Sequence, residues 1–401
     1  MRAIVLSGGG AKGSYELGVW KALRKLNINY DIVTGTSVGA LNGALMVQKS
    51  YLKALFLWYN IHYDDIFEIK KKYTKEEIND LYKDGILNGG VDISNLENTI
   101  KKCVKANRFF KSNIKFGLVT VKFPSLKHVY MTKDKLTKNN LHDYLIASAS
   151  CFPAFKLKKI NNENYIDGGF YDNMPINLAI EMGATEVIAV DLDAIGIKRN
   201  LKYDVPVTYI TPRNKIDSFL KFEKNSARRG IRLGYNDTMK HYKKLDGNLY
   251  TFKQNNLENN FVKYKNLIIK NIENIIGDDS PIIENIVLKK IFKSDKSFYK
   301  ELNEIIEKIG YIYEIDDSYI YDIYMYNNIL IKNIEKTKLN KNEVDSDISK
   351  DKIKMLFNEQ KMVKYIYNLI KQKQNKKIKN LILIYPEEFL MAIYIKTISD
   401  F

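Results

Sequence analysis

Residues 31–45, DIVTGTSVGALNGAL, contain the pattern that decides the fold. A short β-branched run at 31–34 is followed by Gly-Thr-Ser-Val-Gly and then by small apolar residues of helical character. A serine on a sharp strand-to-helix turn is typical of a nucleophile elbow, and Gly35 and Gly39 are needed because side chains there would collide across the turn. In isolation Ser37 would be an ordinary helix N-cap, but the succession of strand, turn and helix favours a nucleophile.

The first 250 or so residues alternate short β-branched runs with longer helical patterns. This alternation predicts a mostly parallel α/β sheet. Between the runs, residues 15–26 place Leu17, Trp20 and Leu23 at helical spacing, which indicates a helix packed on the core. The expected strands are residues 3–6, 31–34, 116–121, 128–131, 186–191 and 205–211.

The second part of the chain differs in composition. From about residue 255 it is rich in Ile, Asn, Lys and Tyr with helical periodicity, so we expect a catalytic domain at 1–254 and an all-α domain at 255–401. Residues 361–379 carry seven lysines and no acid, interleaved with apolar residues. A helix packed on its own domain is favoured there over a helix lying on a membrane surface.

A glycine-rich block, Gly8-Gly9-Gly10-Ala11-Lys12-Gly13, links the first expected strand to the first helix. Backbone N–H groups at such a helix N-terminus stabilise negative charge. The block also fits the dinucleotide-binding pattern G-x-G-x-x-G. That pattern requires a ribose-binding acid at the end of the second strand, where this chain has Gly-Thr-Ser at residues 35–37. A Walker loop requires Gly-Lys-Ser/Thr, whereas the order here is Lys-Gly-Ser. Phosphate binding is therefore the lesser alternative.

A third block, Asp167-Gly168-Gly169, follows an extended run at 164–166 and precedes Pro175, which we expect to open a helix. Alone, Asp-Gly is a turn signal. His241 is the only histidine after Asp167, and it lies in a charged helical stretch, so a Ser-acid-His triad is disfavoured. The remaining possibility is a dyad in which a carboxylate accepts the serine proton while backbone amides bind the oxyanion.

These three blocks together resemble the signature blocks of patatin-like phospholipases. Residues 147–150 with 153–155, and Asn173-Met174-Pro175, resemble the segments that flank the family's aspartate. Lys12 matches the family's basic position. Val38 departs from the pattern, because a smaller residue often stands beside the nucleophile. The resemblance covers about residues 1–250 and does not extend to the helical domain.

The resemblance implies a three-layer α/β/α sandwich with Ser37 as nucleophile and Asp167 as proton acceptor. It also implies an oxyanion hole from Gly8, Gly9 and Gly10, and hydrolysis of fatty-acyl esters of phospholipids, lysophospholipids or acylglycerols through an acyl-enzyme, without metal or cofactor. An acyltransferase or thioesterase with the same nucleophile is the alternative, and a nucleotide- or membrane-binding protein without hydrolase activity is a more distant one. The supporting motif positions are Lys12, Gly13, Gly35, Gly39, Gly168 and Gly169.

The net charge of +17 is concentrated in the predicted catalytic part. Residues 1–254 contain 40 Lys and Arg against 25 Asp and Glu, and the densest stretch, 198–244, has 13 against 4. A solvated face and a platform for anionic headgroups fit this stretch equally well. We expect no nucleic-acid partner, because no aromatic residues are regularly interleaved with the basic residues of this stretch. If an anionic membrane surface is the partner, added salt should screen the attraction and lower activity.

The sequence predicts a cytosolic protein that can associate with a membrane surface. No stretch approaches the about 18 consecutive apolar residues of a spanning helix, and no charged leader precedes a long apolar run. Cys103 and Cys151 lie in separate segments, and the four histidines are scattered. We therefore expect no disulfide, no metal site and no cofactor.

Overall fold

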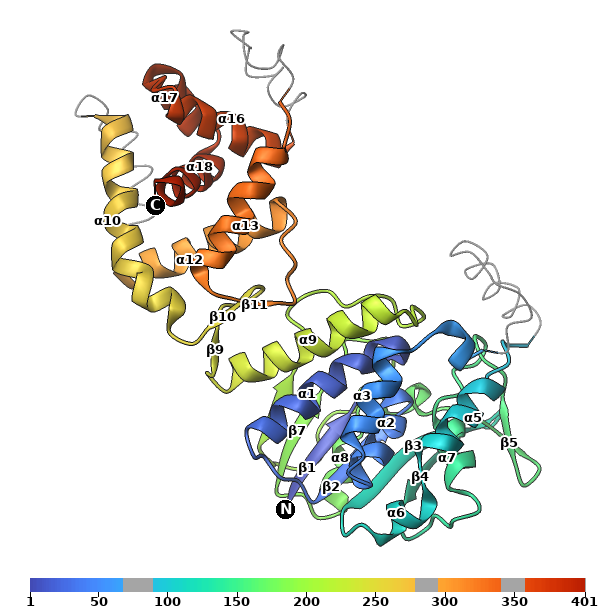
Figure 1. Ribbon diagram of the computed structural model, residues 1–401. Helices are drawn as coiled ribbons and strands as arrows, with labels where there is room; N and C mark the ends of the chain where they lie inside the picture. The colour runs from blue at the N-terminus through green and yellow to red at the C-terminus, as the bar shows by residue number, and fades with distance from the viewer. Residues whose placement is uncertain (68–88, 278–294, 340–357, 401) are drawn as a thin grey trace. The chain divides into compact units, whose positions relative to one another are not determined.

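The structure, a computed structural model, describes residues 1–67, 89–277, 295–339 and 358–400. The chain forms two compact units, Met1–His241 and Tyr242–Phe401 (Figure 1). The division precedes a short hairpin of strands β9 (Leu245–Asp246) and β10 (Thr251–Lys253), which pairs with β11 (Ile320–Tyr321). This pairing ties the hairpin to the second unit, so the units separate earlier than the composition change near residue 255 suggests.

The first unit is built on an eight-stranded sheet. Its strand order is β5-β6-β3-β2-β1-β7-β8, and β4 also pairs with β3. Along this order the pairs from β3 to β8 are parallel, whereas β4, β5 and β6 join by antiparallel pairing, which confirms a mostly parallel sheet. The strands are β1 (Arg2–Leu6), β2 (Ile32–Thr36), β3 (Lys115–Phe123), β4 (His128–Thr132), β5 (Lys158–Ile160), β6 (Glu163–Asp167), β7 (Glu186–Val190) and β8 (Val207–Ile210).

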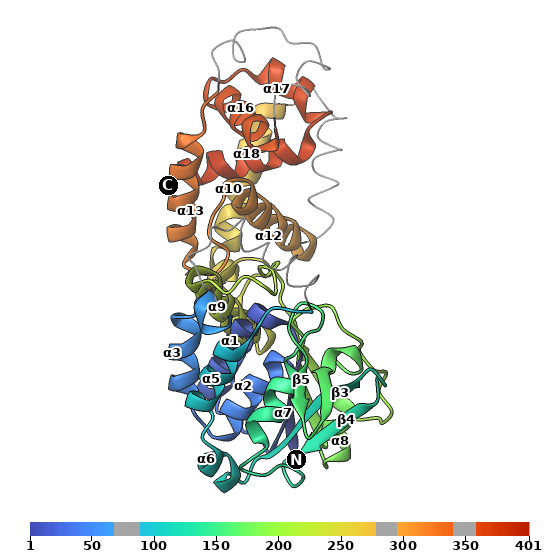
Figure 2. The ribbon, with the colours of Figure 1, turned by 90° about the vertical axis from the view of Figure 1, so that its right-hand side faces the viewer.

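Helices cover both faces of this sheet, as the predicted three-layer α/β/α fold requires. Figure 2 shows the strands between α2 (Val38–Val47) and α8 (Ile176–Glu181). Because side chains alternate along a strand, Ala3 and Val5 pack with α8 on one face while Leu6 faces α2 on the other. The remaining helices of this unit are α1 (Ser14–Lys25), α3 (Tyr51–Tyr59), α5 (Ser94–Cys103), α6 (Ala106–Lys111), α7 (Leu141–Ser148) and α9 (Lys224–His241), with short 3-10 turns at Gly10–Gly13, Tyr63–Asp65 and Gly168–Phe170.

Helices α1 and α9 pack in unusually close contact, because glycines replace larger side chains at their crossing. A Cβ on Gly18 would lie 2.1 Å from the Ile231 carbonyl oxygen, and one on Gly234 would lie 2.0 Å from the Tyr15 carbonyl oxygen. Real Cβ atoms do not approach backbone oxygens this closely, so both positions require glycine. The contact fixes α1, and with it the glycine-rich block that precedes it.

The second unit is helical, with the β9-β10-β11 sheet as its only β structure among the described residues. Its core includes both faces of α18, whose buried residues run from Phe389 to Ile395. The lysine-rich stretch forms α16 and α17, and its apolar residues Met362 and Ile366 are buried in this core, as expected for a helix packed on its own domain. The helices are α10 (Asn256–Ile276), α12 (Asp295–Ile312), α13 (Ile323–Lys336), α16 (Glu359–Lys371), α17 (Asn375–Ile382) and α18 (Pro386–Ser399).

No helix within the described ranges combines the length and the apolar character needed to cross a membrane.

A buried carboxyl links α1 to α2. Asn42 Nδ2 donates a 2.7 Å hydrogen bond to Glu16 Oε2, while Glu16 Oε1 is buried without a partner among the described residues. Trp58 Nε1 in turn donates to Asn42 Oδ1 at 3.0 Å. Burial raises the pKa of Glu16 from 4.5 to about 8, and the bond from Asn42 opposes this rise only in part. The folded protein therefore holds Glu16 protonated at neutral pH.

Replacing Glu16 with Gln should stabilise the protein at alkaline pH. In the unfolded chain the carboxyl ionises near 4.5 and in the folded chain near 8, so unfolding releases a proton between these values. The free energy of unfolding then falls with rising pH by up to about 1.4 kcal/mol per pH unit in this window. The glutamine side chain would keep an acceptor for Asn42 but cannot ionise. Melting temperatures measured from pH 5 to pH 8 should show a growing advantage of Glu16→Gln, and the exposed Glu181→Gln should show none. An advantage that does not change with pH would contradict the assignment.

Candidate active site

The register of the sheet brings Ser37 and Asp167 together. Thr36, the last residue of β2, pairs with Val119 of β3, and Asp167, the last residue of β6, pairs with the next residue, Thr120. Two strands from distant parts of the chain thus end at the same level on opposite edges of β3. There Ser37 and Asp167 line one cavity, and the Ser37 hydroxyl is near enough to the carboxyl of Asp167 to lower its pKa. The structure thus brings the two residues of the predicted pair together at one point of the sheet.

Ser37 sits on a strained turn. Its backbone has φ 56° and ψ −128°, which L-residues adopt only when their surroundings hold them there. Its N–H donates to Ser148 Oγ at 3.0 Å, and that hydroxyl donates to the Val119 carbonyl at 2.7 Å. Helix α2 begins at the next residue, so the positive end of its dipole lies at Ser37. Ser37 is 9% exposed.

The glycines that flank Ser37 have the predicted steric reason. A Cβ on Gly35 would lie 2.4 Å from the Gly39 carbonyl oxygen, and a Cβ on Gly39 would lie 2.4 Å from the Leu6 carbonyl oxygen. Both contacts are with backbone atoms that cannot move aside without displacing β1 or α2. Gly35 and Gly39 therefore allow the close backbone approach on which the elbow depends.

Asp167 is buried and held by backbone groups. Its Oδ1 accepts a 2.7 Å hydrogen bond from the Gly169 N–H, and its own N–H donates to the Ser150 carbonyl at 2.9 Å. Gly168 is required beside it, because a Cβ there would lie 2.3 Å from the Val119 carbonyl oxygen. Burial raises the pKa of Asp167 to about 6, against the opposing hydrogen bonds from Ser37 and Gly169. A carboxylate with a pKa near neutrality is suited to accept a proton during catalysis.

The glycine-rich block differs in detail from the predicted set of oxyanion donors. The Gly8 N–H donates to the Asn173 carbonyl at 3.0 Å, so in this structure it is engaged and does not point to a free acceptor. Within the described residues, the N–H groups of Gly9 and Gly10 have no protein acceptor. Both glycines are partly exposed and line the same cavity as Ser37. The sequence pattern alone could not reveal that Gly8 is bonded to a residue so far along the chain.

Lys12 and Gly13, the two other predicted positions of this block, have structural roles. Lys12 Nζ donates to the backbone carbonyls of Leu192 at 3.3 Å and Asp193 at 2.8 Å, so it fastens the loop after β7. A Cβ on Gly13 would lie 2.4 Å from Val38 Cγ2, so glycine makes room for the larger residue beside the nucleophile. An ammonium engaged in this way does not favour the phosphate-binding alternative.

Two cavities meet at Ser37. The larger, of about 490 Å³, is bordered by Ser37, Asp167 and the three glycines on one side, and its other walls are mainly apolar. The smaller, of about 60 Å³, lies between α2, α3 and α5 and is lined by residues such as Leu45, Trp58 and Ile100. Ser37 and Phe155 line both cavities. The arrangement can hold an ester carbonyl at the hydroxyl with apolar groups on either side.

None of the four histidines lines either of these cavities. His128 stacks on Tyr171 at 3.9 Å between ring centroids, and the His142 ring nitrogen Nε2 lies 2.9 Å from the Val104 carbonyl oxygen. His241 is the last residue of α9. The disfavoured triad alternative has no geometric support in the described structure.

Sequence reasoning missed the roles of Ser148 and Ser150. It identified their segment only by resemblance, yet Ser148 holds the backbone of Ser37 and Ser150 holds that of Asp167. The segment thus holds both residues of the predicted pair. The repeated Ala-Ser pattern of residues 147–150 was the available signal. The pattern alone does not predict these roles, because they depend on hydrogen bonds to residues far away in the chain.

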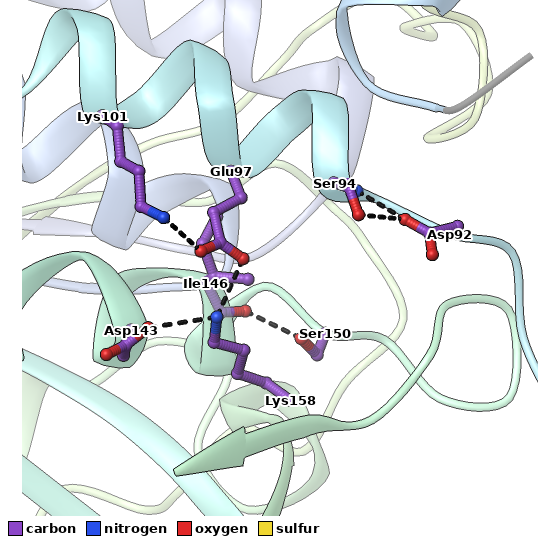
Figure 3. Close-up of polar contacts among 8 residues, drawn as sticks. All are labelled: Asp92, Ser94, Glu97, Lys101, Asp143, Ile146, Ser150 and Lys158. Atoms are coloured by element: carbon purple, nitrogen blue, oxygen red, sulfur yellow. Dashed lines mark hydrogen bonds and ion pairs between the residues drawn. The ribbon is translucent and has the colours of Figure 1, made fainter.

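An ion-pair network fastens the helix that forms one wall of the smaller cavity (Figure 3). Lys158 Nζ lies 2.8 Å from Glu97 of α5 and 3.1 Å from Asp143 of α7, and Lys101 also pairs with Glu97, at 2.7 Å. Burial alone would lower the pKa of Lys158, but the bonds to the two acids raise it. Ser150 Oγ donates to the Ile146 carbonyl of α7 at 2.9 Å. Because the Ser150 carbonyl also accepts from the Asp167 N–H, α7 is connected to the strand that carries Asp167.

Replacing Lys158 with Met should lower the free energy of unfolding by about 1–3 kcal/mol, because two partly buried carboxylates lose their shared partner. Lys101→Met is the matched control: it removes the exposed partner of Glu97 and should cost less than about 1 kcal/mol. Urea unfolding of the three proteins measures the difference. Equal losses in the two variants would show that Lys158 has no special role in holding α5.

Comparison with known proteins finds one family model and several relatives, and these agree with one another. Residues 4–180 match the family Patatin, described as patatin-like phospholipase, and all three predicted blocks lie within the matched residues. The chain is 29% identical over 195 residues to "Patatin-like phospholipase domain-containing protein 7" of Rattus norvegicus, covering 47% of this chain and 13% of that protein. It is 25% identical over 208 residues to "Lysophospholipase NTE1" of Candida albicans, covering 50% of this chain and 14% of that protein.

A third relative is "Neuropathy target esterase sws" of Drosophila melanogaster, 27% identical over 203 residues, covering 47% of this chain and 13% of that protein. The aligned part of the chain therefore spans only about one seventh of the length of these relatives. Among solved structures, VipD from Legionella pneumophila aligns over 99% of this chain and 90% of that chain, with 14% identity and a TM-score of 0.37. The resemblance inferred from the three blocks is confirmed by the family match.

Proposed function

We propose that this protein, whose residues 4–180 form a patatin-like phospholipase domain, is a serine hydrolase that cleaves fatty-acyl esters of lipids. One observation carries the proposal: a strained serine lies beside a buried carboxylate at the junction of two largely apolar cavities. Neither the backbone strain of Ser37 nor the burial of the Asp167 carboxyl stabilises the fold. Destabilising features of this kind are typical of catalytic residues.

In the proposed mechanism, Ser37 Oγ attacks the acyl carbonyl carbon and its proton passes to Asp167. The N–H groups of Gly9 and Gly10 bind the oxyanion of the tetrahedral intermediate. Asp167 then gives the proton to the departing alcohol oxygen, and an acyl-enzyme remains. Water attacks the acyl-enzyme while Asp167 accepts its proton, and return of that proton to Ser37 releases the fatty acid.

The relatives favour phospholipids and lysophospholipids as substrates. One is named a phospholipase domain-containing protein, one a lysophospholipase and one an esterase. The apolar walls of the larger cavity, which include Phe155, Phe219 and Ile197, suit an acyl chain beside the reacting carbonyl. The net positive charge of the catalytic part is the reason to propose an anionic membrane surface as the site of action.

The test joins active-site labelling to product analysis. A fluorophosphonate should form one adduct on the native full-length chain, and mass spectrometry should place it on the peptide containing Ser37. Incubation with lysophosphatidylcholine in oxygen-18-labelled water should release fatty acid carrying one heavy oxygen. An adduct on a different serine, or no fatty acid from any lysophospholipid, phospholipid or acylglycerol, would overturn the proposal.

The same experiment separates hydrolysis from acyl transfer. An acyl-enzyme can be resolved by an alcohol or thiol as well as by water. If added monoacylglycerol diverts most of the acyl group into a new ester, the protein is an acyltransferase with the same nucleophile.

A further inference from the structure

One wall of the larger cavity continues to the protein surface as exposed apolar side chains. Phe170, Ile195 and Ile197 line this cavity and are 44%, 96% and 49% exposed. Leu201 and Tyr203 follow along the chain and are 43% and 46% exposed. Large exposed apolar side chains gathered in this way mark an interaction surface. We refer to residues 195–203 as the rim segment.

The start of the rim segment is held in place by both halves of the site. The Ile197 N–H donates to the Gly169 carbonyl at 2.9 Å, and the Ile197 carbonyl accepts from the Asn173 N–H at 2.6 Å. On the other side, the Leu192 N–H donates to Ser7 Oγ at 2.9 Å, directly before the glycine-rich block. The isoleucine between these anchors is therefore presented to solvent by a fixed loop beside the dyad.

The charge of the rim segment indicates what it meets. Between residues 195 and 203 the chain has three cations, Lys198, Arg199 and Lys202, and no acid. Lys198 pairs with Asp191 at 2.6 Å, so the other two carry the charge that a headgroup would meet. The Arg199 guanidinium lies 3.8 Å over the Tyr171 ring, which fixes a positive charge beside the exposed apolar residues. Apolar side chains that enter the acyl region, flanked by cations at headgroup level, are the combination that binds anionic bilayers.

We propose that the rim segment docks on an anionic phospholipid surface and holds the mouth of the larger cavity against it. With Ile195 inserted, an acyl ester leaves the bilayer along apolar walls and reaches Ser37 without crossing water. The purpose of this docking rests on the proposed function, but the docking itself does not require hydrolysis and is measurable without it.

The experiment uses the full chain with Ser37→Ala as the parent, so that no lipid is cleaved. Co-sedimentation measures its affinity for vesicles of phosphatidylcholine alone and of phosphatidylcholine mixed with phosphatidylserine. Adding Ile195→Ser should weaken binding to the mixed vesicles about tenfold, because a whole isoleucine side chain is no longer transferred from water. Adding Lys202→Gln should weaken it about fivefold and reduce its salt dependence.

Leu52→Ser is the matched control. Leu52 is 74% exposed on α3 and lines neither cavity, so its loss should leave vesicle binding unchanged. Thermal unfolding of each variant checks that the fold is retained. The proposal is overturned if the parent does not bind mixed vesicles, if it binds neutral vesicles as tightly, or if Ile195→Ser costs no more than Leu52→Ser. Binding by the parent together with an inactive wild type would uphold the docking and refute the proposed hydrolase.

Discussion

Replacing Ser37 with Ala should lower the rate of lipid ester hydrolysis by about 10⁴-fold or more, the loss seen when a nucleophile that forms an acyl-enzyme is removed. Without Oγ no covalent intermediate forms, and only the backbone donors and the cavity remain to favour attack by water. Release of fatty acid from lysophosphatidylcholine, followed at several substrate concentrations, gives the change in kcat/KM.

The backbone of Ser37 makes a second variant informative. With φ at 56°, an alanine stays strained there, whereas a glycine adopts this conformation without cost. Ser37→Gly should therefore be at least as stable as the wild type in thermal unfolding and as inactive as Ser37→Ala. A stable Ser37→Gly protein that keeps more than a few per cent of the activity would rule out Ser37 as the nucleophile.

The parts of the fold that the sequence predicted are those whose signals are local. The β2 turn and α2 were predicted because strand, glycine pair and helix stand within 15 residues, and β1 through the start of α1 follow the same logic. The expected opening of a helix at Pro175 was also close, since Pro175 caps α8. Strands of two or three residues, such as β5, β9 and β11, are too short to show a period of two, and they were missed.

The catalytic geometry was less accessible to sequence reasoning, because it depends on pairing between distant segments. Motif order suggested that Ser37 and Asp167 meet, but the physical reason is an antiparallel strand, β6, that joins β3 where β2 ends. Likewise, the hydrogen bond of the Gly8 N–H is to the carbonyl of Asn173, and no pattern within residues 8–13 could predict that partner.

Counting charges overstated the free positive surface. Arg199 and Arg228, both in the basic stretch, lie over tyrosine rings and donate to backbone carbonyls of Tyr171 and Tyr59. Lys240 is buried in an ion pair with Asp237. Lys198 is likewise paired with Asp191, at 2.6 Å. The charge proposed to face a membrane is therefore that of Lys202 and of the Arg199 guanidinium, which keeps its charge while Tyr171 holds it in place.

The second large effect concerns the base. Asp167→Asn should lower kcat/KM by about 10³-fold, because the amide keeps the shape and can accept the Gly169 N–H but cannot accept the proton of Ser37. In the wild type, burial raises the pKa of Asp167 to about 6, so the carboxylate is protonated below that pH. Activity should thus fall about tenfold for each pH unit below the pKa and level off above it. The residual activity of Asp167→Asn should lack this inflection.

Asp172 provides the control that makes this pH profile decisive. Burial raises its pKa to about 6 as well, but its carboxylate accepts from the Met174 N–H and Tyr130 hydroxyl and does not contact Ser37. An inflection near pH 6 in the wild type could therefore arise from either acid. If Asp167 is the base, Asp172→Asn retains the inflection and most of the activity. If the inflection disappears in Asp172→Asn and persists in Asp167→Asn, the proton of Ser37 goes elsewhere and the proposed dyad is wrong.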